Sequence, residues 1–281
     1  MKTDTAAIRP MVAGPRGFYP RNPEELRSTL DNLLRSAQAA VGEAEPVALV
    51  VPHAGYTFSG AMAARAYAQL RGHSYDRVVV IGPSHYELFP GASVFRGSGY
   101  QTPLGNVPVD GDFVRALHDT GAGFGYTPQA EEQEHSVEVQ VPFLQRVLGA
   151  FDIVPVLIHD GRPANCRALA DGLVSAMHAR PRRTLLVASS DLYHGPGHKR
   201  ARAASDATAG VLAQGDPERF AEAVATGACQ ACGSAAIVVA LMAARALGAE
   251  RVRLLGVTTS FEVAPRGEDY VVGYLAAVIH R

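Results

Sequence analysis

Apolar positions are distributed along the chain in two distinct patterns. The first consists of short, nearly continuous apolar runs, which are typical of strands buried on both faces of a sheet. These runs cover residues 47–51, 77–81, 152–158, 184–188, 252–257 and 270–279. The second consists of longer segments with helical periodicity, which lie between the runs. The chain is therefore predicted to alternate between buried strands and helices.

Several of the periodic segments carry the signals that begin and end a helix. Asn22 precedes Pro23 and two glutamates, a combination that provides an N-cap, a proline in the first turn and favourable charge at the helix start. Leucines then repeat on one face, and Gly42 predicts the helix end. Asp216-Pro217-Glu218 opens another helix in the same way. Further helices are predicted over residues 59–70, 167–177 and 233–247.

The alternation of strands and helices continues from one end of the chain to the other. It predicts an α/β fold, a three-layer αβα domain around a central sheet that is mostly parallel or mixed. We find neither an internal repeat nor a linker long enough to separate domains. Residues 1–281 are therefore expected to form a single domain.

Composition narrows the classes of function. The net charge is −1 and the isoelectric point is near 6.8, so there is no electrostatic case for binding nucleic acid or an acidic membrane surface. No segment approaches the roughly 20 uninterrupted apolar residues of a membrane helix. The three cysteines do not form a disulfide framework, and no apolar segment follows the N-terminal charges. A cytoplasmic location is expected.

Polar side chains follow three of the predicted strands where each strand ends. His53 follows the run 47–51, His85 follows 77–81, and Asp191 and His194 follow 184–188. Ligands bind at the carboxyl ends of strands in open α/β sheets, so these side chains are expected to converge. Any single histidine is as readily explained as a hydrogen-bonded structural residue. Three strand ends of similar design indicate a functional site.

Cys232 adds a thiol to this set. It directly precedes the helix predicted over residues 233–247, and a helix N-terminus favours the thiolate form. The alternative is a small buried thiol, the common fate of a free cysteine. Cys229 and Cys232 also form a C-x-x-C pair, which is a weak redox or zinc signal without a second pair.

His135 lies in a glutamate-rich segment, residues 131–138. Such a segment is commonly the solvated start of a helix. The alternative is that His135 faces the substrate or supports a metal ligand, with a carboxylate orienting its ring.

Taken together, these motifs resemble the Memo family, also called AmmeMemoRadiSam system protein B, which is related in fold to class III extradiol dioxygenases. The resemblance spans nearly the full chain, and its strings occur in the family's order. They are Arg9-Pro10, Val12-Ala13-Gly14, Phe18-Tyr19-Pro20, Pro52-His53-Ala54-Gly55-Tyr56, Gly82-Pro83-Ser84-His85, Thr102-Pro103-Leu104-Gly105, Glu134-His135-Ser136 with Glu138, Ser189-Ser190-Asp191 with His194, and Cys232-Gly233.

The resemblance implies a pocket like that of a non-haem iron dioxygenase. His53, His85 and Cys232 would be the metal ligands, and Asp191 and His194 the catalytic residues beside the metal. Residues expected to contact substrate or support the ligands are His135, Tyr56 and Glu138. The implied cofactor is one metal ion, with iron as the first choice and copper or zinc as alternatives. The implied partners are a small-molecule or peptide ligand and a functionally linked radical-SAM protein.

One departure from the family pattern lies after Cys232-Gly233. The family commonly has bulkier residues or proline there, whereas this chain has Ser234-Ala235-Ala236. The shape of the pocket near Cys232 is therefore expected to differ.

Three hypotheses about function follow. The favoured one is a mononuclear iron, or copper, oxidoreductase, in which two imidazoles and one anionic ligand leave positions open and His194 moves protons. The second is a metal-binding or peptide-binding protein without turnover. The third is a metal-free hydrolase or transferase with Cys232 as nucleophile, His194 as base and Asp191 orienting it. The sequence leaves the substrate and the oligomeric state open.

Overall fold

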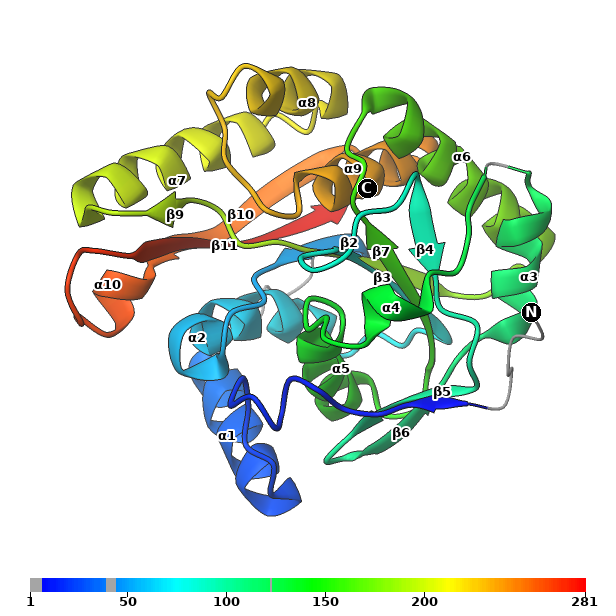
Figure 1. Cartoon of the computed structure of the whole chain (residues 1–281), viewed down its shortest axis with the longest axis horizontal. Helices are drawn as coiled ribbons and strands as arrows, with labels where there is room; N and C mark the ends of the chain where they lie inside the picture. The colour runs from blue at the N-terminus through cyan, green and yellow to red at the C-terminus, as the bar shows by residue number, and fades with distance from the viewer. Residues whose placement is uncertain (1–6, 39–43, 122) are drawn as a thin grey trace.

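The fold is built on a central mixed sheet, seen in a computed structural model that describes residues 7–38, 44–121 and 123–281 (Figure 1). Within those ranges the main sheet has eight strands in the order β10-β11-β2-β8-β3-β7-β4, with β9 paired to β11. The strands are β2 (Pro46–Val51), β3 (Arg77–Pro83), β4 (Ala92–Val94), β7 (Asp152–Ile158), β8 (Thr184–Ser189), β9 (His194–Gly195), β10 (Arg251–Thr259) and β11 (Val271–His280).

The centre of this sheet is parallel and its two sides are antiparallel. Strands β2, β8, β3 and β7 run parallel to one another, so their carboxyl ends share one edge. Strands β10 and β11 on one side and β4 on the other add antiparallel pairs. All six strands predicted from apolar runs belong to this sheet. Because β2, β3 and β8 precede the predicted site residues, their shared edge is where those residues collect.

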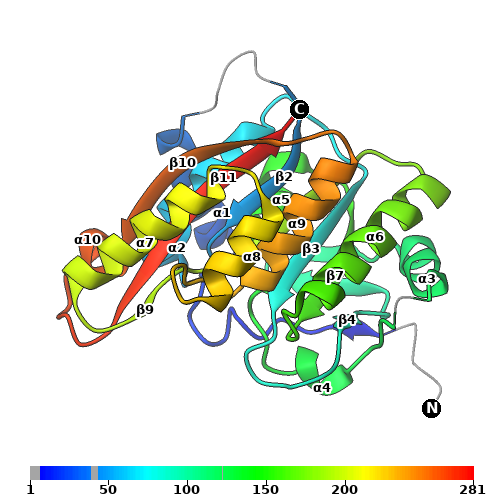
Figure 2. The same ribbon diagram turned by 90° about the horizontal axis from the view of Figure 1, so that it is seen from above.

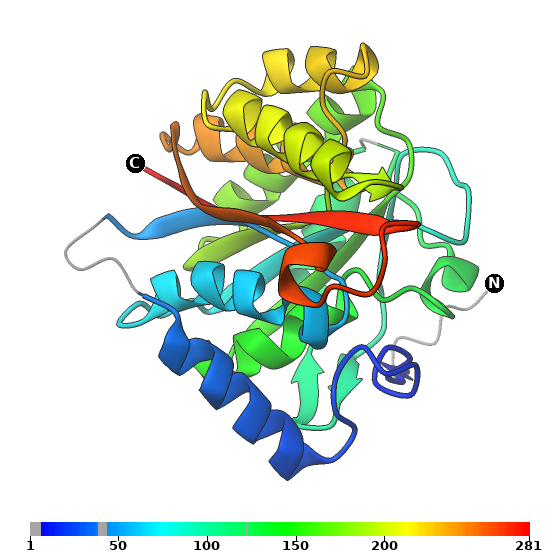
Figure 3. The same ribbon diagram turned by 90° about the vertical axis from the view of Figure 1, so that its left-hand side faces the viewer.

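Helices cover both faces of the sheet, which gives three layers (Figures 2 and 3). One face carries α3 (Gly111–Asp119), α6 (Pro163–Ala179), α7 (His198–Leu212), α8 (Pro217–Ala225) and α9 (Ser234–Ala246). The other carries α1 (Pro23–Ser36), α2 (Tyr56–Tyr67) and α5 (Val141–Leu148). Separate apolar cores fill the two spaces between sheet and helices. The predicted αβα architecture is confirmed.

Local sequence explains the predicted helices well and others poorly. Asn22 caps α1 by accepting hydrogen bonds from the backbone of Glu24 and Glu25. The helix ends at Ser36, before the stop predicted at Gly42, which lies outside the described residues. Helix α7 was not predicted, because alanines and charged residues give it little apolar periodicity and its packing on β10 and β11 defines its buried face.

Several short elements also lacked a usable sequence pattern. A second, three-stranded sheet combines β1 (Ile8–Arg9), β5 (Gly99–Thr102) and β6 (Gly105–Pro108). Single turns of helix occur at α4 (Pro128–Glu131), η2 (Glu138–Gln140) and α10 (Ser260–Val263), whereas η1 (Ala68–Leu70) is the last turn of the helix predicted over residues 59–70. Runs of two to four residues are too short to show a period, and their pairing partners are distant in sequence. Among the described residues, no helix is both long and apolar enough to span a membrane.

A buried ionic network attaches the N-terminal segment to the loop that follows α4. The guanidinium of Arg9 lies between the carboxylates of Glu131 and Glu138, at 2.8 and 2.7 Å. It also donates to the backbone carbonyls of Glu131 and Glu134. If residues 131–138 moved away, Arg9 and the two glutamates would be left as unpaired buried charges, which is strongly unfavourable. The network therefore holds residues 131–138 in place.

Candidate metal centre

Three histidines meet at the carboxyl edge of the parallel strands. His53 follows β2, His85 follows β3, and His135 comes from the loop between α4 and η2. One ring nitrogen from each lies within 4.8 Å of the other two. The ring centroids are 5.2 Å apart for His53 and His85, 5.5 Å for His53 and His135, and 4.9 Å for His85 and His135. The cluster is a possible metal-binding histidine triad.

Hydrogen bonding assigns the protonated nitrogen of His53. Its Nδ1 lies 2.9 Å from the hydroxyl of Ser189. That hydroxyl uses its only hydrogen in a bond to the carbonyl of Ser136, and it accepts another bond from the Gln140 amide. Ser189 therefore accepts from His53, and Nδ1 carries the proton. The lone pair of His53 is therefore on Nε2, which faces the Cys232 sulfur at 3.3 Å and is the atom that could bind a metal.

Glu134 assigns His85 in the same way. Its Oε1 lies 3.0 Å from His85 Nδ1, and an ionised carboxylate can only accept, so Nε2 of His85 keeps its lone pair. The carboxylate also accepts from the backbone N–H groups of His85, His135 and Ser136. Burial alone would raise the pKa of Glu134, but hydrogen bonds from His85 lower it to about 2. Glu134 is thus a fixed anion behind the cluster.

His135 completes the cluster with an unused nitrogen. Within the described part of the chain its buried Nδ1 has no hydrogen-bond partner, although Glu134 Oε1 lies 3.4 Å away. Burial, followed by the neighbouring His53, lowers the pKa of His135 to about 3. Burial and His85 lower the pKa of His53 to about 3 as well. Neutral imidazoles with free lone pairs are the form that binds metals, so this donor set fits a transition metal.

Cys232 lies beside the triad, next to His53. Its Sγ is 3.3 Å from His53 Nε2, and it accepts a hydrogen bond of 3.2 Å from the backbone N–H of Asp191. Burial and the Asp191 carboxylate raise the pKa of this thiol well above its ordinary value. Burial and the Asp191 carboxylate therefore outweigh the effect of the nearby start of α9, and the expected preference for the thiolate is not met in the metal-free pocket. A bound cation would supply the positive charge that stabilises the thiolate of Cys232.

The two cysteines of the C-x-x-C pair have different surroundings. Both are free thiols in this structure. Cys229 is buried, and a hydrogen bond with Thr208 partly offsets the rise that burial causes in its pKa. The sulfur of Cys232 instead faces His53 and the backbone of Asp191.

Asp191, which contacts Cys232, and His194 lie beside the cluster. Asp191 is buried, and its Oδ1 accepts from the backbone N–H of His53 at 2.8 Å. Burial raises the pKa of Asp191 to about 6, opposed by backbone hydrogen bonds from His53 and Ala54. His194 is exposed, and its Nδ1 pairs with the carbonyl of Leu192 at 2.9 Å. Its Nε2 is consequently available for proton exchange with solvent or substrate.

The structure places Tyr56 and Glu138 in the supporting framework. The Tyr56 hydroxyl donates to the carbonyl of Val139 at 2.7 Å. The Glu138 carboxylate, fully buried, accepts from Arg9, from the Tyr19 hydroxyl and from the backbone N–H groups of Val12 and Ala13. Their hydrogen bonds join the N-terminal segment to residues 137–140, which carry the Gln140 contact with Ser189.

Sequence reasoning did not single out Glu134, Ser189 and Gln140 as functional residues. Glu134 had a usable signal, since a carboxylate directly before a candidate histidine is a natural orienting group. Ser189 lies at the end of β8, two residues before Asp191, and also had a positional signal. Gln140 had none, because its side chain reaches β8 only through the packing of η2 on the sheet edge.

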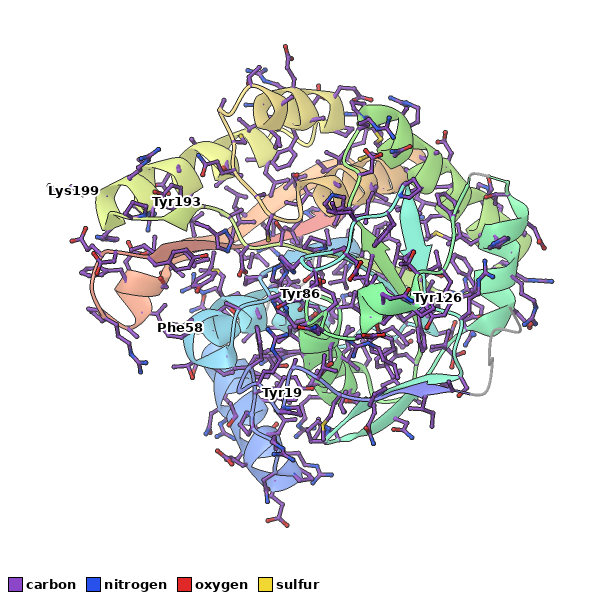
Figure 4. All side chains as sticks on the ribbon, in the orientation of Figure 1. Tyr19, Phe58, Tyr86, Tyr126, Tyr193 and Lys199 are labelled. Atoms are coloured by element: carbon purple, nitrogen blue, oxygen red, sulfur yellow. The ribbon has the colours of Figure 1, made fainter. Side chains whose placement is uncertain are left out.

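Aromatic and cationic side chains surround the opening of the cluster. The Phe18 ring lies 4.3 Å from the His135 ring, and Tyr86, which is 42% exposed and labelled in Figure 4, lies 6.4 Å from it. Arg16 donates to the Tyr86 hydroxyl and to the carbonyl of Gln133, both at 2.7 Å. The N-terminal segment thus forms one side of the site.

Comparison with known proteins identifies the family. A family model described as Memo-like protein matches residues 9–278. The chain belongs to the Memo family. A MEMO1 family protein of Thermoplasma volcanium is 31% identical over 274 residues, covering 97% of this chain and 98% of the relative. A MEMO1 family protein of Methanopyrus kandleri is 33% identical over 285 residues, with coverage of 97% and 98%. A MEMO1 family protein of Ignicoccus hospitalis is 33% identical over 277 residues, with coverage of 95% and 96%.

The depressed histidine pKa values in this Memo family protein predict a loss of stability on mild acidification. His53 and His135 have pKa values of about 3 when folded and near 6.5 when unfolded, so below pH 6.5 the unfolded chain binds more protons. Stability therefore falls as pH decreases across that window. Asp191, with its pKa raised to about 6, binds a proton preferentially in the folded state and opposes this effect. The net uptake of about one proton corresponds to a loss of roughly 1.4 kcal/mol per pH unit between pH 6 and 5.

Urea denaturation of the metal-free protein at pH 6 and pH 5 measures this slope. The Asp191→Asn variant removes the opposing group, so its slope should be about twice that of the wild type. A free energy of unfolding that stays constant or rises between pH 6 and 5 would contradict the assignment of two neutral, buried histidines.

Proposed function

We propose that this Memo family protein binds one transition-metal ion at the histidine cluster, with iron as the first choice and copper or zinc as alternatives, and that with iron or copper it acts as an oxidoreductase. The observation that carries the proposal is the hydrogen bonding of His53 and His85. Ser189 and Glu134 each hold Nδ1–H and so direct one Nε2 lone pair from each ring to the cluster. Structural histidines have no need for two such matched tautomers.

The third ligand is contributed by His135 or Cys232. His135 belongs to the triad and is neutral at pH 7, whereas Cys232 lies 3.3 Å from His53 Nε2 and must first lose a proton. Three imidazoles suit iron, copper or zinc, and a thiolate shifts the preference towards softer metals. When bound, a redox metal with an open position supplies one-electron chemistry and a binding site for oxygen or substrate.

The other residues of the site bind, orient or move protons. Glu134 holds His85, and Ser189 holds His53, so the ligand geometry is set before a metal arrives. Asp191 fixes the backbone of His53 by accepting its N–H. His194 is exposed and has a free ring nitrogen, the properties required of a residue that exchanges protons with a substrate.

A second candidate function is non-catalytic binding of a metal or a peptide in the same pocket. The rim of Tyr86 and Arg16 favours it, because an exposed aromatic ring beside a guanidinium is a common recognition surface for a partner. In this case the metal would organise the rim, and no turnover would follow its binding.

Metal analysis of site variants tests the proposal and identifies the third ligand. Protein purified anaerobically, without chelators or a metal-affinity column, is expected to contain one metal ion per chain. If Cys232 is a ligand, Cys232→Ala should lose the metal and His135→Ala should retain it; if His135 is the ligand, the pattern reverses. Cys229→Ala is the matched control, since its thiol is directed at Thr208, and it should retain the metal. A metal-free wild type, or equal loss in both cysteine variants, would contradict the proposed site.

A further inference from the structure

A small chamber adjoins the histidine cluster on the side of Cys232. It has a volume of about 270 Å³ and lies between the loops after β3 and β7 and the start of α9. His85 and Cys232 contribute to its lining, together with the hydroxyl-bearing Ser84 and Ser234. A molecule in this chamber therefore lies against two of the side chains proposed to hold the metal.

An open groove adjoins the chamber on its outer side. This groove has a volume of about 560 Å³ and shares His159 and Gly161 with the chamber. Its other side is apolar, formed by the consecutive residues Leu88, Phe89 and Pro90. Leu88 is 78% exposed, so its side chain is accessible to a molecule in the groove.

Charge at the groove is already balanced within the protein. Arg162 and Asp160, which both line it, form an ion pair with each other, with Arg162 Nε 2.9 Å from both carboxylate oxygens. Because the two charges neutralise each other, the groove has little electrostatic attraction for a charged ligand. The groove is therefore suited to an apolar segment, and the chamber, with its hydroxyls and metal-ligating side chains, to a polar group.

We propose that the chamber and groove form the substrate site, and that the substrate is a small amphiphile with a polar, metal-binding head and an apolar tail. This rests on the proposed metal-dependent function. The chamber has the volume of about nine water molecules, enough for a compact head group and too little for a folded peptide segment. The tail passes Gly161 and lies along Leu88–Pro90.

Gly161 lies at the boundary between the two compartments. It lines both, and a Cβ added to it would meet only the Cβ of Ala235, at 3.5 Å, which is an ordinary van der Waals contact. Its backbone is outside the left-handed region, so a larger residue is tolerated by the fold. A side chain at position 161 would point towards Ala235, which lines the chamber, and would obstruct the passage.

Binding of two hydroxamates to Co²⁺-loaded protein tests this proposal. Acetohydroxamate supplies a metal-binding head alone, and hexanohydroxamate adds four methylenes. Calorimetry and the Co²⁺ absorption spectrum should show that hexanohydroxamate binds at least about tenfold tighter, since each buried methylene contributes up to about fourfold. In Gly161→Leu this advantage should fall below about threefold, with Co²⁺ stoichiometry unchanged.

The matched control is Gly210→Leu, which introduces the same side chain at an exposed position of α7 where an added Cβ meets no atom within 4 Å. It should behave as wild type. Equal affinity for the two probes, or an undiminished advantage in Gly161→Leu, would overturn the proposed site. The same probes are also followed by NMR on metal-free protein, where tail binding should remain sensitive to Gly161→Leu. A protein that shows this sensitivity but binds no Co²⁺ would support the pocket and contradict the proposed metal function.

Discussion

His53→Ala is expected to abolish stoichiometric metal binding. His53 is a member of the histidine triad, and its Nε2 also lies 3.3 Å from the Cys232 sulfur, so it belongs to the ligand set whichever of His135 and Cys232 is the third ligand. Its ring is buried and its Nε2 carries the lone pair, and alanine offers no nitrogen in its place. Metal content per chain, measured after anaerobic purification, should fall from about one to near zero.

Glu134→Gln should weaken metal binding only partly, in contrast to the complete loss expected for His53→Ala. The amide retains the shape of the carboxylate but removes the charge that holds His85 Nδ1–H and three backbone N–H groups. Loss of an outer partner of a ligating histidine typically costs about 10–100-fold in metal affinity. The loss in Glu134→Gln should therefore be partial, measured as a shift in the dissociation constant. Retention of full metal content by His53→Ala would show that the metal does not bind at this cluster.

His194→Ala is expected to retain the metal and to lose most of any oxidative turnover. His194 lies outside the histidine triad, is exposed, and presents a free Nε2 near Asp191 and His53. A residue that transfers protons acts on the transition state and contributes about 10²–10⁴-fold in rate without changing metal affinity. Turnover is measured by screening phenolic and thiol substrates under oxygen, with metal content determined on the same samples.

Two outcomes would change this interpretation. If His194→Ala loses the metal as completely as His53→Ala, His194 is a ligand and does not serve as the acid or base. If the wild type holds iron and none of the screened substrates is converted, the protein is a binding protein and the rim of Tyr86 and Arg16 becomes the relevant surface. His198 is a suitable control position, because it pairs with Glu262 and does not belong to the histidine triad. His198→Ala should retain both metal and turnover.

The sequence by itself determined the layers of the fold and the edge where chemistry collects. Buried strands such as β3 read as continuous apolar runs because both of their faces are covered, so their positions follow from composition alone. Parallel neighbours then bring their carboxyl ends to one edge, and for that reason His53, His85 and Asp191 were predicted to lie near one another. A local pattern and one rule of sheet topology are sufficient for this part of the site.

Only the tertiary structure decided which further residues join those side chains in the site, and which protonation states they adopt. His135 and Glu134 lie in a loop whose glutamate-rich sequence suggested a solvated helix start, and the loop is placed at the cluster by Arg9, more than 120 residues earlier in the chain. The tautomers of His53 and His85, and the raised pKa of the Cys232 thiol, depend on burial and on partners from other segments of the chain. Contacts between distant segments and the desolvation they cause have no local signature in sequence, because both arise only when the chain has packed.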